Sequence, residues 1–392
     1  MAAFSMDFPA SQHTVRVRLI NTTAVMTIKA ELFIRPVQKG QESLNVTSAA
    51  FLIEHEASNR KIMFDLGVRK DYWNLSPAVQ KRLGTVITSL KVDTDTPTIL
   101  QDNGIGLDSI SSVVFSHYHW DHVGDMSLFP SSTEIVVGPG FKASPVILPG
   151  YPEKPDSFLN SSDFAGRHLN EIDFGDAGLR IGGFRAHDFF GDGSFYLLDS
   201  PGHCVGHMCG LARTTGGDDS TFVLMGGDIC HFIGDIRPSK AFPMPNPLPP
   251  GVLDGDLPTP CPCTFFTDHH PQGLEEAGQD ERRSTPFYLV SESTASYADP
   301  KTAQVSVDKL LKFEQSSNVL ICIAHDGALL KYLPTLNSDP SADMNDWHQR
   351  GWKERCRWEW LNELPRSGKP GRPAHVEGFW RDGKKWDRPQ PT

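Results

Sequence analysis

Two long stretches near the start of the chain, residues 14–34 and 49–66, are rich in β-branched and other apolar side chains. Turn-type residues separate them at Gly40 and Asn45. Apolar, β-branched stretches bounded by turn residues are typical of strands and hairpins. We therefore predict that the chain begins by entering a β-sheet.

Shorter apolar runs recur further along and alternate with helix-like patterns. The apolar runs predict strands at residues 110–115, 134–138, 178–184, 194–199, 222–226 and 318–324. The helix-like patterns lie at residues 71–90, 97–102, 301–314 and 345–361. Strands in both halves of the chain, with helices between them, favour an α/β or α+β sandwich.

One segment breaks this regularity. Residues 237–262 carry nine prolines and little periodicity. Proline lacks a backbone donor and fixes φ, so the segment cannot form a regular element. A loop of this length inside a domain is usually a lid, a binding loop or a disordered stretch. Because it begins nine residues after Asp228, we expect an insertion at residues 237–285 whose proline-rich part lies at the mouth of a functional site.

Length and composition limit the remaining alternatives. The 392 residues include 39% hydrophobic and 10% aromatic side chains, enough for a sizeable core. The net charge of −11, without a basic run, argues against a nucleic-acid partner. No apolar stretch approaches the ~20 residues that span a bilayer. We predict a catalytic domain over residues 1–335, with a helical or irregular extension over residues 336–392 packed on it.

Cysteine usage bears on the compartment. The chain has seven cysteines, an odd number scattered through a long sequence, which argues against a disulfide framework. Its first nine residues lack a basic segment followed by an apolar one, so no secretory signal is visible. We expect a cytoplasmic protein. The sequence leaves the oligomeric state open, with a homodimer as one alternative.

The strongest chemical signal follows the apolar run at residues 110–115. The segment SHYHWDH places four metal-binding side chains within six residues, namely His117, His119, Asp121 and His122. A loop at the end of a strand can bring such side chains to one point. Imidazoles and a carboxylate together suit zinc or another first-row ion. We therefore predict a metal site here.

Further candidate ligands follow later predicted strands. They are His203, Asp228 and His325. Glycines beside His203 and Asp228 let the backbone approach an ion closely. A site with two ions needs more ligands than the first segment supplies, and these three residues are the natural candidates.

In this order, the motifs H-x-H-x-D-H, S-P-G-H-x-x-G-H, G-G-D and A-H-D resemble the metallo-β-lactamase superfamily. The resemblance is greatest to its lactonase-like branch, which includes enzymes that open N-acyl homoserine lactones. It runs from about residue 49 to residue 326 and implies a four-layer αβ/βα sandwich with metals at one edge. It also implies that a first metal is held by His117, His119 and His203, a second by Asp121, His122 and His325, and that Asp228 bridges them.

The chemistry expected of such a centre is hydrolysis. Two divalent ions lower the pKa of a water held between them, which supplies a nucleophile without a side-chain base. Zinc is the expected ion, with iron, manganese and cobalt left open. Asp121 and Asp228 are then catalytic through the metals. We predict a dinuclear hydrolase that opens a lactone or lactam by attack of a metal-bridging hydroxide. Fungal members of the superfamily that open lactam rings look broadly similar.

One residue departs from the family pattern. Lactonases of this branch have a tyrosine three residues after the bridging aspartate, where this chain has His231. An imidazole can donate a hydrogen bond, or a proton to a leaving group such as an amide nitrogen. We predict that His231 is catalytic.

Other reactions on the same centre stay open. They are thioester hydrolysis of the glyoxalase II kind, phosphodiester hydrolysis, and oxygenation at a mononuclear iron site. A glutathione thioesterase needs basic residues in its C-terminal helices, where this chain has Lys353, Arg355 and Arg357. The acidic net charge weakens the phosphodiester alternative.

Several residues are expected to support the site. Asp65 is expected to orient a metal-bound histidine, as metal sites usually require. Asp326 either does the same or caps the turn that follows it. His207 is interpreted as structural, because His203 already provides a ligand. The candidates for the wall of a substrate pocket are Trp120, Phe189, Phe190 and Phe232.

Overall fold

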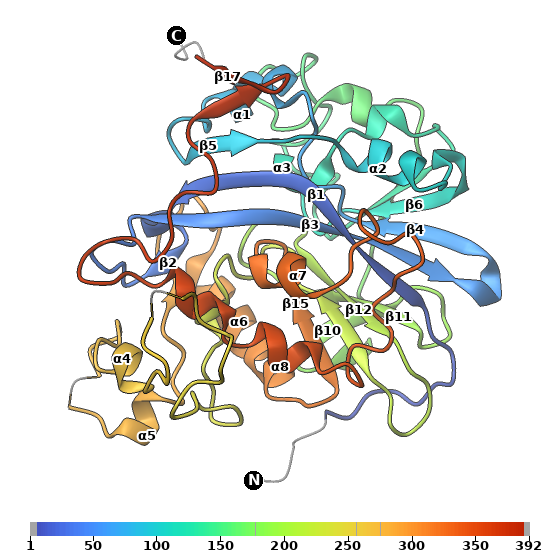
Figure 1. Ribbon diagram of the computed structural model, residues 1–392. Helices are drawn as coiled ribbons and strands as arrows, with labels where there is room; N and C mark the ends of the chain where they lie inside the picture. The colour runs from blue at the N-terminus through green and yellow to red at the C-terminus, as the bar shows by residue number, and fades with distance from the viewer. Residues whose placement is uncertain (1–5, 177, 256, 275, 388–392) are drawn as a thin grey trace.

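The computed structural model of the protein describes residues 6–176, 178–255, 257–274 and 276–387. A nine-stranded sheet and a six-stranded sheet pack against each other, and helices lie outside them (Figure 1). A small third sheet pairs β2 (Ile34–Arg35) with β14 (Leu289–Val290). The predicted α/β sandwich is therefore confirmed.

The larger sheet is mixed. Its strands, in order across the sheet, are β17 (Lys384–Trp386), β16 (Phe379–Arg381), β5 (Ile87–Lys91), β1 (Arg16–Lys29), β3 (Ser43–His55), β4 (Arg60–Phe64), β6 (Ile110–Val114), β7 (Glu134–Val137) and β8 (Leu169–Glu171). Strands β4, β6, β7 and β8 run parallel, so their C-terminal ends meet at one edge. Strand β6 ends at Val114, directly before the histidine-rich segment.

The smaller sheet delivers the later candidate ligands to the same region. Its strands, in order, are β15 (Val319–Cys322), β13 (Phe222–Met225), β12 (Met208–Arg213), β11 (Phe195–Asp199), β10 (Phe184–Asp188) and β9 (Arg180–Ile181). Strands β13 and β15 are parallel neighbours. The loops that follow them therefore emerge side by side and carry Asp228 and His325.

The helices are mostly short. They are α1 (Pro77–Gln80), α2 (Thr96–Asp102), α3 (Trp120–Val123), α4 (Thr264–Thr267), α5 (Gln279–Arg282), α6 (Pro300–Glu314), α7 (Gly327–Tyr332) and α8 (Trp352–Cys356). The longest, α6, begins at an Asp299 side chain that accepts a hydrogen bond from the Thr302 amide. This N-cap and the proline at the first helical position fix where the helix starts. No helix in the described part of the chain is long and apolar enough to cross a membrane.

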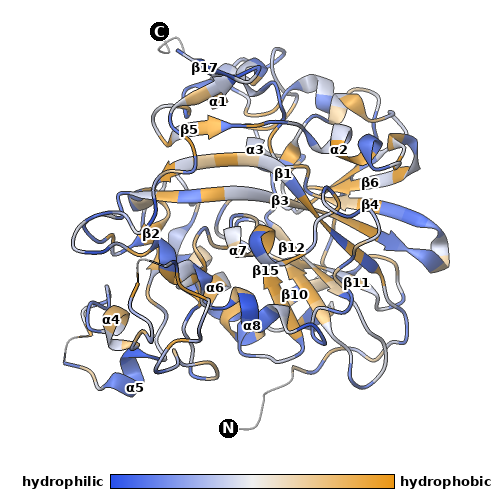
Figure 2. Ribbon diagram, in the orientation of Figure 1, coloured by the Kyte–Doolittle hydropathy of each residue, from blue (hydrophilic) through white to orange (hydrophobic). Residues whose placement is uncertain are grey.

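The core between the sheets is made by alternate side chains of both. Figure 2 shows the apolar residues concentrated on the strands and the polar ones around the periphery. Phe64, Val114, Leu197 and Val223 belong to one buried cluster and are at most 1% exposed. Side chains alternate across a strand, so one face of each sheet supplies this core. All seven cysteines are buried free thiols.

Three sequence predictions of local structure were wrong in part. Residues 71–90 hold only one short helix, and their second half enters β5, which pairs with β1. Residues 178–184 form a hairpin of β9 and β10, because Gly182 and Gly183 adopt positive φ between them. Residues 345–361 break into α8 and a 3₁₀ segment at Glu359–Glu363. Strands β8, β12, β14, β16 and β17 were not predicted.

The C-terminal segment packs on the sandwich. Trp347 is 1% exposed, and β16 pairs with β5 of the larger sheet. Trp386 contacts Trp73, with ring centroids 6.4 Å apart. The proline-rich segment contacts the same part of the chain, since Asp254 forms an ion pair with Arg372 at 2.7 Å. These contacts bury its apolar side chains, so it is a packed loop.

Candidate metal centre

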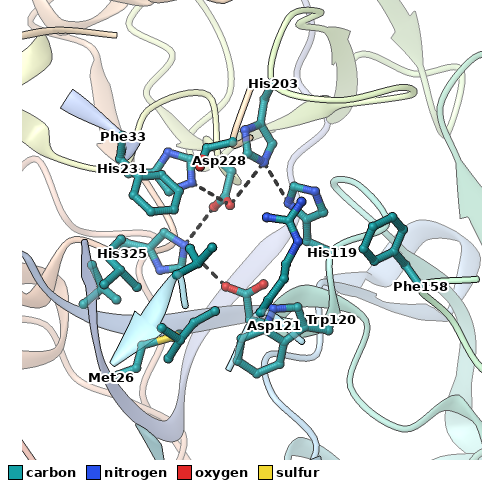
Figure 3. A pocket seen from close by; sticks show the side chains of 16 residues that line it. Met26, Phe33, His119, Trp120, Asp121, Phe158, His203, Asp228, His231 and His325 are labelled. Carbon is teal, nitrogen blue, oxygen red and sulfur yellow. Dashed lines mark hydrogen bonds and ion pairs between the residues drawn. The ribbon is translucent and has the colours of Figure 1, made fainter. Parts of the chain in front are cut away.

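Seven predicted ligands converge at the edge where strands of both sheets end, and Figure 3 shows five of them, His119, Asp121, His203, Asp228 and His325. Four come from the segment that follows β6 and runs into α3, and the others follow β11, β13 and β15. They are His117, His119, Asp121, His122, His203, Asp228 and His325. The structure thus brings together every residue that the sequence assigned to the metal site.

Asp228 lies at the middle of this group. Its Oδ1 is 3.0 Å from Nε2 of His122 and 3.0 Å from Nε2 of His325. Its Oδ2 is 3.5 Å from Nε2 of His117 and 3.5 Å from Nε2 of His203. One carboxylate therefore faces two separate sets of imidazoles, as a bridging ligand must.

Three sets of side chains have the spacing of metal ligands, and the third joins His203, Asp228 and His231. His117, His119 and His203 form the first, together with Cys204, whose thiol the sequence interpretation left aside. Asp121, His122, Asp228 and His325 form the second. Within each set, the ligand atoms lie within 4.8 Å of one another.

The donor atoms fit divalent cations. His117 Nε2, His122 Nε2 and Asp228 Oδ1 are buried without a hydrogen-bond partner among the described residues. Leaving such atoms unpaired costs about 1–3 kcal/mol each. Burial and the neighbouring imidazoles hold the pKa of His117 well below its usual value, so its ring is neutral and offers a lone pair. A cation among these atoms removes the penalty.

The second set also carries excess negative charge. Burial alone lowers the pKa of His122, but the carboxylates of Asp228, Asp65 and Asp121 together raise it well above its usual value. Three acidic groups around one buried imidazole stabilise positive charge at that position. A divalent ion supplies that charge.

Outer contacts fix the orientation of the ligand rings. Asp65 Oδ2 accepts a hydrogen bond from His122 Nδ1 at 2.9 Å, and its Oδ1 accepts one from the Ser116 amide at 2.7 Å. This is the position that the sequence analysis expected for Asp65. His325 Nδ1 donates to the backbone oxygen of Thr47 at 2.6 Å. Both rings therefore present Nε2 to Asp228.

Asp326 takes the second of its two expected roles. Its side chain accepts a hydrogen bond from the Ala328 amide and caps α7. Its other oxygen lies 4.0 Å from Arg237. The ring of His325 is held by Thr47 instead, so Asp326 caps a helix.

The backbone at Asp228 is held by His207. His207 Nε2 accepts a hydrogen bond from the Asp228 amide at 3.0 Å, and its Nδ1 lies 2.9 Å from Ser200 Oγ. The preceding Gly227 has φ of +51°, and a Cβ there would stand 2.7 Å from the Ser116 Cβ. This close approach explains the glycine. His207 is thus structural, as interpreted from the sequence.

A pocket opens onto Asp121 and Asp228. Its apolar wall is formed by Met26, Ile28, Phe33, Val46, Val86, Ile87, Trp120 and Phe158. Two polar residues outside the metal cluster, Arg82 and Ser296, also line it. An apolar cavity with a few polar groups is the usual form of a small-molecule site.

Only Trp120 among the predicted pocket residues lines this cavity. Phe190 stacks on His55 with ring centroids 4.0 Å apart, and Phe189 lies beside Phe190, so both are away from the centre. Phe232 lines a separate cavity. Adjacency in sequence to site residues was a poor guide, because neighbouring side chains leave a strand or loop on different sides. Likewise, no described residue of the segment 237–285 lines the pocket, so the expectation that its proline-rich part lies at the mouth of the site is not met there.

His231 contacts the carboxylate of Asp228. Its Nε2 lies 3.1 Å from Asp228 Oδ2, and its Nδ1 lies 2.9 Å from the hydroxyl of Tyr297. Tyr297 is fully buried, and burial raises the pKa of its hydroxyl well above the usual value, so it keeps its proton. Tyr297 was not predicted as a site residue, because 66 residues separate it from His231.

The basic residues considered for a thioesterase do not reach the pocket. Lys353 is buried, and its Nζ donates to the backbone oxygens of Glu314, Ser316 and Val319. Arg357 is buried beside Glu314. Neither lines the cavity at the metal cluster.

The chain is similar in sequence to known metal-dependent hydrolases. The sequence pattern of the Metallo-beta-lactamase superfamily matches residues 45–216. Gamma-lactamase FDB1 of Fusarium pseudograminearum is 44% identical over 362 residues, which cover 91% of this chain and 84% of that protein. Metallo-hydrolase mfmC of Annulohypoxylon moriforme is 38% identical over 365 residues, covering 92% and 90%. Gamma-lactamase MBL2 of Gibberella moniliformis is 45% identical over 251 residues, covering 64% and 100%.

Solved structures share the fold. A variant of AiiA from B. thuringiensis, with N-decanoyl-L-homoserine bound at its active site, gives a TM-score of 0.51 at 16% identity, over 82% of this chain and 98% of that chain. An N-acyl homoserine lactone hydrolase, with the product N-hexanoyl-L-homoserine at its catalytic metal center, gives 0.50 at 16% identity over the same shares. At this identity the likeness concerns the fold alone.

Proposed function

Since the chain belongs to the metallo-β-lactamase superfamily and is a metal-dependent hydrolase, we propose that it opens a small cyclic ester or amide, a lactone or a lactam. The observation that carries the proposal is the Asp228 carboxylate between two sets of imidazoles, at the floor of an apolar pocket. Two relatives named gamma-lactamase, at 44% and 45% identity, support a small cyclic substrate.

The proposed centre holds two divalent ions, with zinc as the expected metal. His117, His119 and His203 would hold one, Asp121, His122 and His325 the other, and Asp228 both. When bound, such a pair lowers the pKa of a water between the ions towards neutrality and polarises the substrate carbonyl. The donor set of imidazoles and carboxylates supports zinc, and metal analysis of the purified protein tests it.

The protein's own groups supply the rest of the reaction. Ring opening adds hydroxide to the carbonyl carbon, breaks its bond to the ring oxygen or nitrogen, and leaves that atom needing a proton. We place His231 at this step, because its Nε2 faces the centre from beside Asp228. The buried Tyr297 hydroxyl keeps its proton and lies 2.9 Å from His231 Nδ1 and 3.1 Å from the backbone oxygen of Phe33. We propose that it donates to His231 Nδ1 in the reacting state, which leaves the ring proton on Nε2. The apolar wall excludes bulk water from this exchange.

The role of His231 depends on the leaving atom. Replacing it by glutamine removes the group that can transfer a proton. We expect kcat for a lactam to fall roughly 100-fold and kcat for the matching lactone about tenfold, since an amide nitrogen needs the proton more. Tyr297→Phe is expected to lower the lactam rate in the same direction, by less. Steady-state kinetics on one lactone–lactam pair measure this, with metal content as the control. Equal losses on both rings would contradict a proton-donating role.

The reaction class is tested on a panel of substrates. We expect the purified protein to open a lactone or a lactam, and expect chelation of its metals to reduce turnover at least tenfold, with recovery when zinc is restored. The matched panel includes a thioester and a phosphodiester. Cleavage of either one, with both rings left intact, would keep the metal centre and overturn the proposed substrate class. One iron per chain, with uptake of oxygen, would favour an oxygenase instead.

The site of action is proposed to be the cytosol. Seven buried free thiols are typical of proteins in a reducing compartment. Fractionation of cells that express the full chain tests this. A small cyclic molecule is the proposed binding partner, and sedimentation of the purified protein decides between a monomer and a homodimer.

A further inference from the structure

The pocket contains one permanently charged side chain outside the metal cluster. Arg82 follows α1 and lines the pocket together with Phe158 and Ser296. Its guanidinium donates a hydrogen bond to the Ala295 backbone oxygen at 3.0 Å and stands 5.5 Å from the centre of the Phe158 ring. These two contacts hold the guanidinium at the wall of the pocket.

This guanidinium has no acidic partner. Across residues 6–387, as far as they are described, no carboxylate lies within 4.0 Å of Arg82. The contact to Ala295 uses one of the five N–H donors of the group. Arg82 lines a pocket whose wall is mostly apolar outside the metal cluster. Arginine is the side chain best suited to grip a carboxylate with two parallel hydrogen bonds.

A second polar group points to the same ligand. Ser296 adjoins Ala295, is 6% exposed, and lines the same pocket. Its hydroxyl is buried and has no hydrogen-bond partner among the described residues. A buried donor left unpaired destabilises the protein, so a ligand that accepts a hydrogen bond from it gains binding free energy. Arg82 and Ser296 thus offer charged and neutral donors in one place.

We propose that Arg82 and Ser296 form a subsite for a carboxylate on the substrate, which makes the natural substrate an anionic cyclic ester or amide. This rests on the proposed function and names its substrate class. The metal centre holds the scissile carbonyl, and the subsite holds the anionic substituent. Two anchors fix the ring in one orientation, which raises the fraction of bound molecules that react.

Charge at the site favours the same class. With two divalent ions bound, the carboxylates of Asp121 and Asp228 and a bridging hydroxide would leave about one net positive charge at the centre, to which Arg82 adds another. The protein as a whole carries a net charge of −11, so this potential is local. A local positive pocket in an acidic protein attracts small anions to that place.

The test compares two γ-butyrolactones of the same shape, one with a carboxymethyl substituent and one with the corresponding carboxamide. We expect the metal-loaded protein to prefer the carboxylate in kcat/KM by roughly 10- to 100-fold, the range of a charge-assisted hydrogen bond. Arg82→Met should abolish the preference, because it lowers kcat/KM for the carboxylate more than for the carboxamide. Ser296→Ala should reduce it in part, and Arg82→Lys should retain part.

Lys81→Met is the matched control. It removes the same charge one residue away, from an exposed side chain that does not line the pocket. We expect it to leave the preference unchanged. Equal rates on the two lactones in the unsubstituted protein would overturn the proposal. So would an equal loss in the Lys81 and Arg82 variants, which would indicate a general field effect.

A binding measurement separates this proposal from the proposed reaction. Isophthalate and 3-carbamoylbenzoate each offer one carboxylate to the metal centre and differ only in the second group. Calorimetric titration of the metal-loaded protein should give at least tenfold tighter binding of isophthalate, lost in Arg82→Met. That result would support the subsite even where no ring is opened. Equal binding of both probes would contradict it whatever the reaction is.

Discussion

Replacing Asp228 by asparagine is expected to lower kcat/KM for ring opening by roughly three orders of magnitude and to release at least one metal ion per chain. Metal ions contribute several kcal/mol of transition-state stabilisation, and each 1.36 kcal/mol is a factor of ten in rate. Asp228 is the one side chain whose two oxygens face both sets of imidazoles, at 3.0 Å and 3.5 Å.

The substitution acts on charge and leaves the fold in place. Asparagine has the same shape, and its backbone amide keeps the hydrogen bond to His207. It offers one neutral oxygen and an NH₂ group, which repels a cation. The four imidazoles that face the Asp228 carboxylate would then hold the two ions without a negative charge between them. Weaker metal binding and slower turnover follow from the same loss.

Metal analysis and kinetics on one preparation measure both effects, and Asp235→Asn serves as the control. Asp235 is also buried, seven residues further along, and burial raises the pKa of its carboxyl well above the usual value, so it is neutral. Its substitution is expected to preserve both ions and most of the activity. If Asp228→Asn kept two ions and lost less than tenfold in rate, the bridging role would be wrong.

The metal site could be predicted from the sequence because its ligands directly follow predicted strands. His203, Asp228 and His325 each follow a short apolar run, and strands of one sheet that end at one edge bring such residues together. The same local logic predicted Asp65, whose carboxylate contacts His122. The residue types and their positions after strands were sufficient to predict the metal ligands and Asp65.

The residues of the pocket could not be predicted in this way. Arg82, Ser296 and Tyr297 lie far from the ligands in sequence and reach the centre only through the packing of loops on the two sheets. None belongs to a motif. The reverse error occurred at Phe189 and Phe190, whose aromatic character suggested a pocket wall, although Phe190 stacks on His55 and Phe189 packs against Phe190. Side-chain direction in a loop depends on tertiary contacts that a single sequence does not reveal.

A second substitution, Glu314→Gln, is expected to destabilise the protein by about 3–5 kcal/mol, as the loss of one partner from a buried ion pair usually does. Glu314 ends α6 and is 1% exposed. Its Oε1 lies 3.1 Å from Arg237 and 3.8 Å from Arg357, and the buried Lys353 is close by. Glutamine leaves these buried cations without their shared carboxylate.

Urea unfolding of the metal-loaded protein measures the loss, with Asp308→Asn as the control. Asp308 is exposed on the same helix and is expected to change stability by less than about 0.5 kcal/mol. A substitution at Glu314 that cost no more than the one at Asp308 would show that the buried cations find other partners.

The pH dependence distinguishes charge from packing. Burial alone raises the pKa of Glu314, but Arg237, Lys353 and Arg357 outweigh it and hold this pKa below its ordinary value of 4.5. The folded state therefore binds the Glu314 proton more weakly than the unfolded chain, so the stabilisation is fully present above about pH 4.5 and is lost as the pH falls through the lower, folded value. Glutamine has no such proton. The gap in unfolding free energy between the two proteins should be widest near neutral pH and should narrow below pH 4.5, whereas a constant gap would assign the loss to packing.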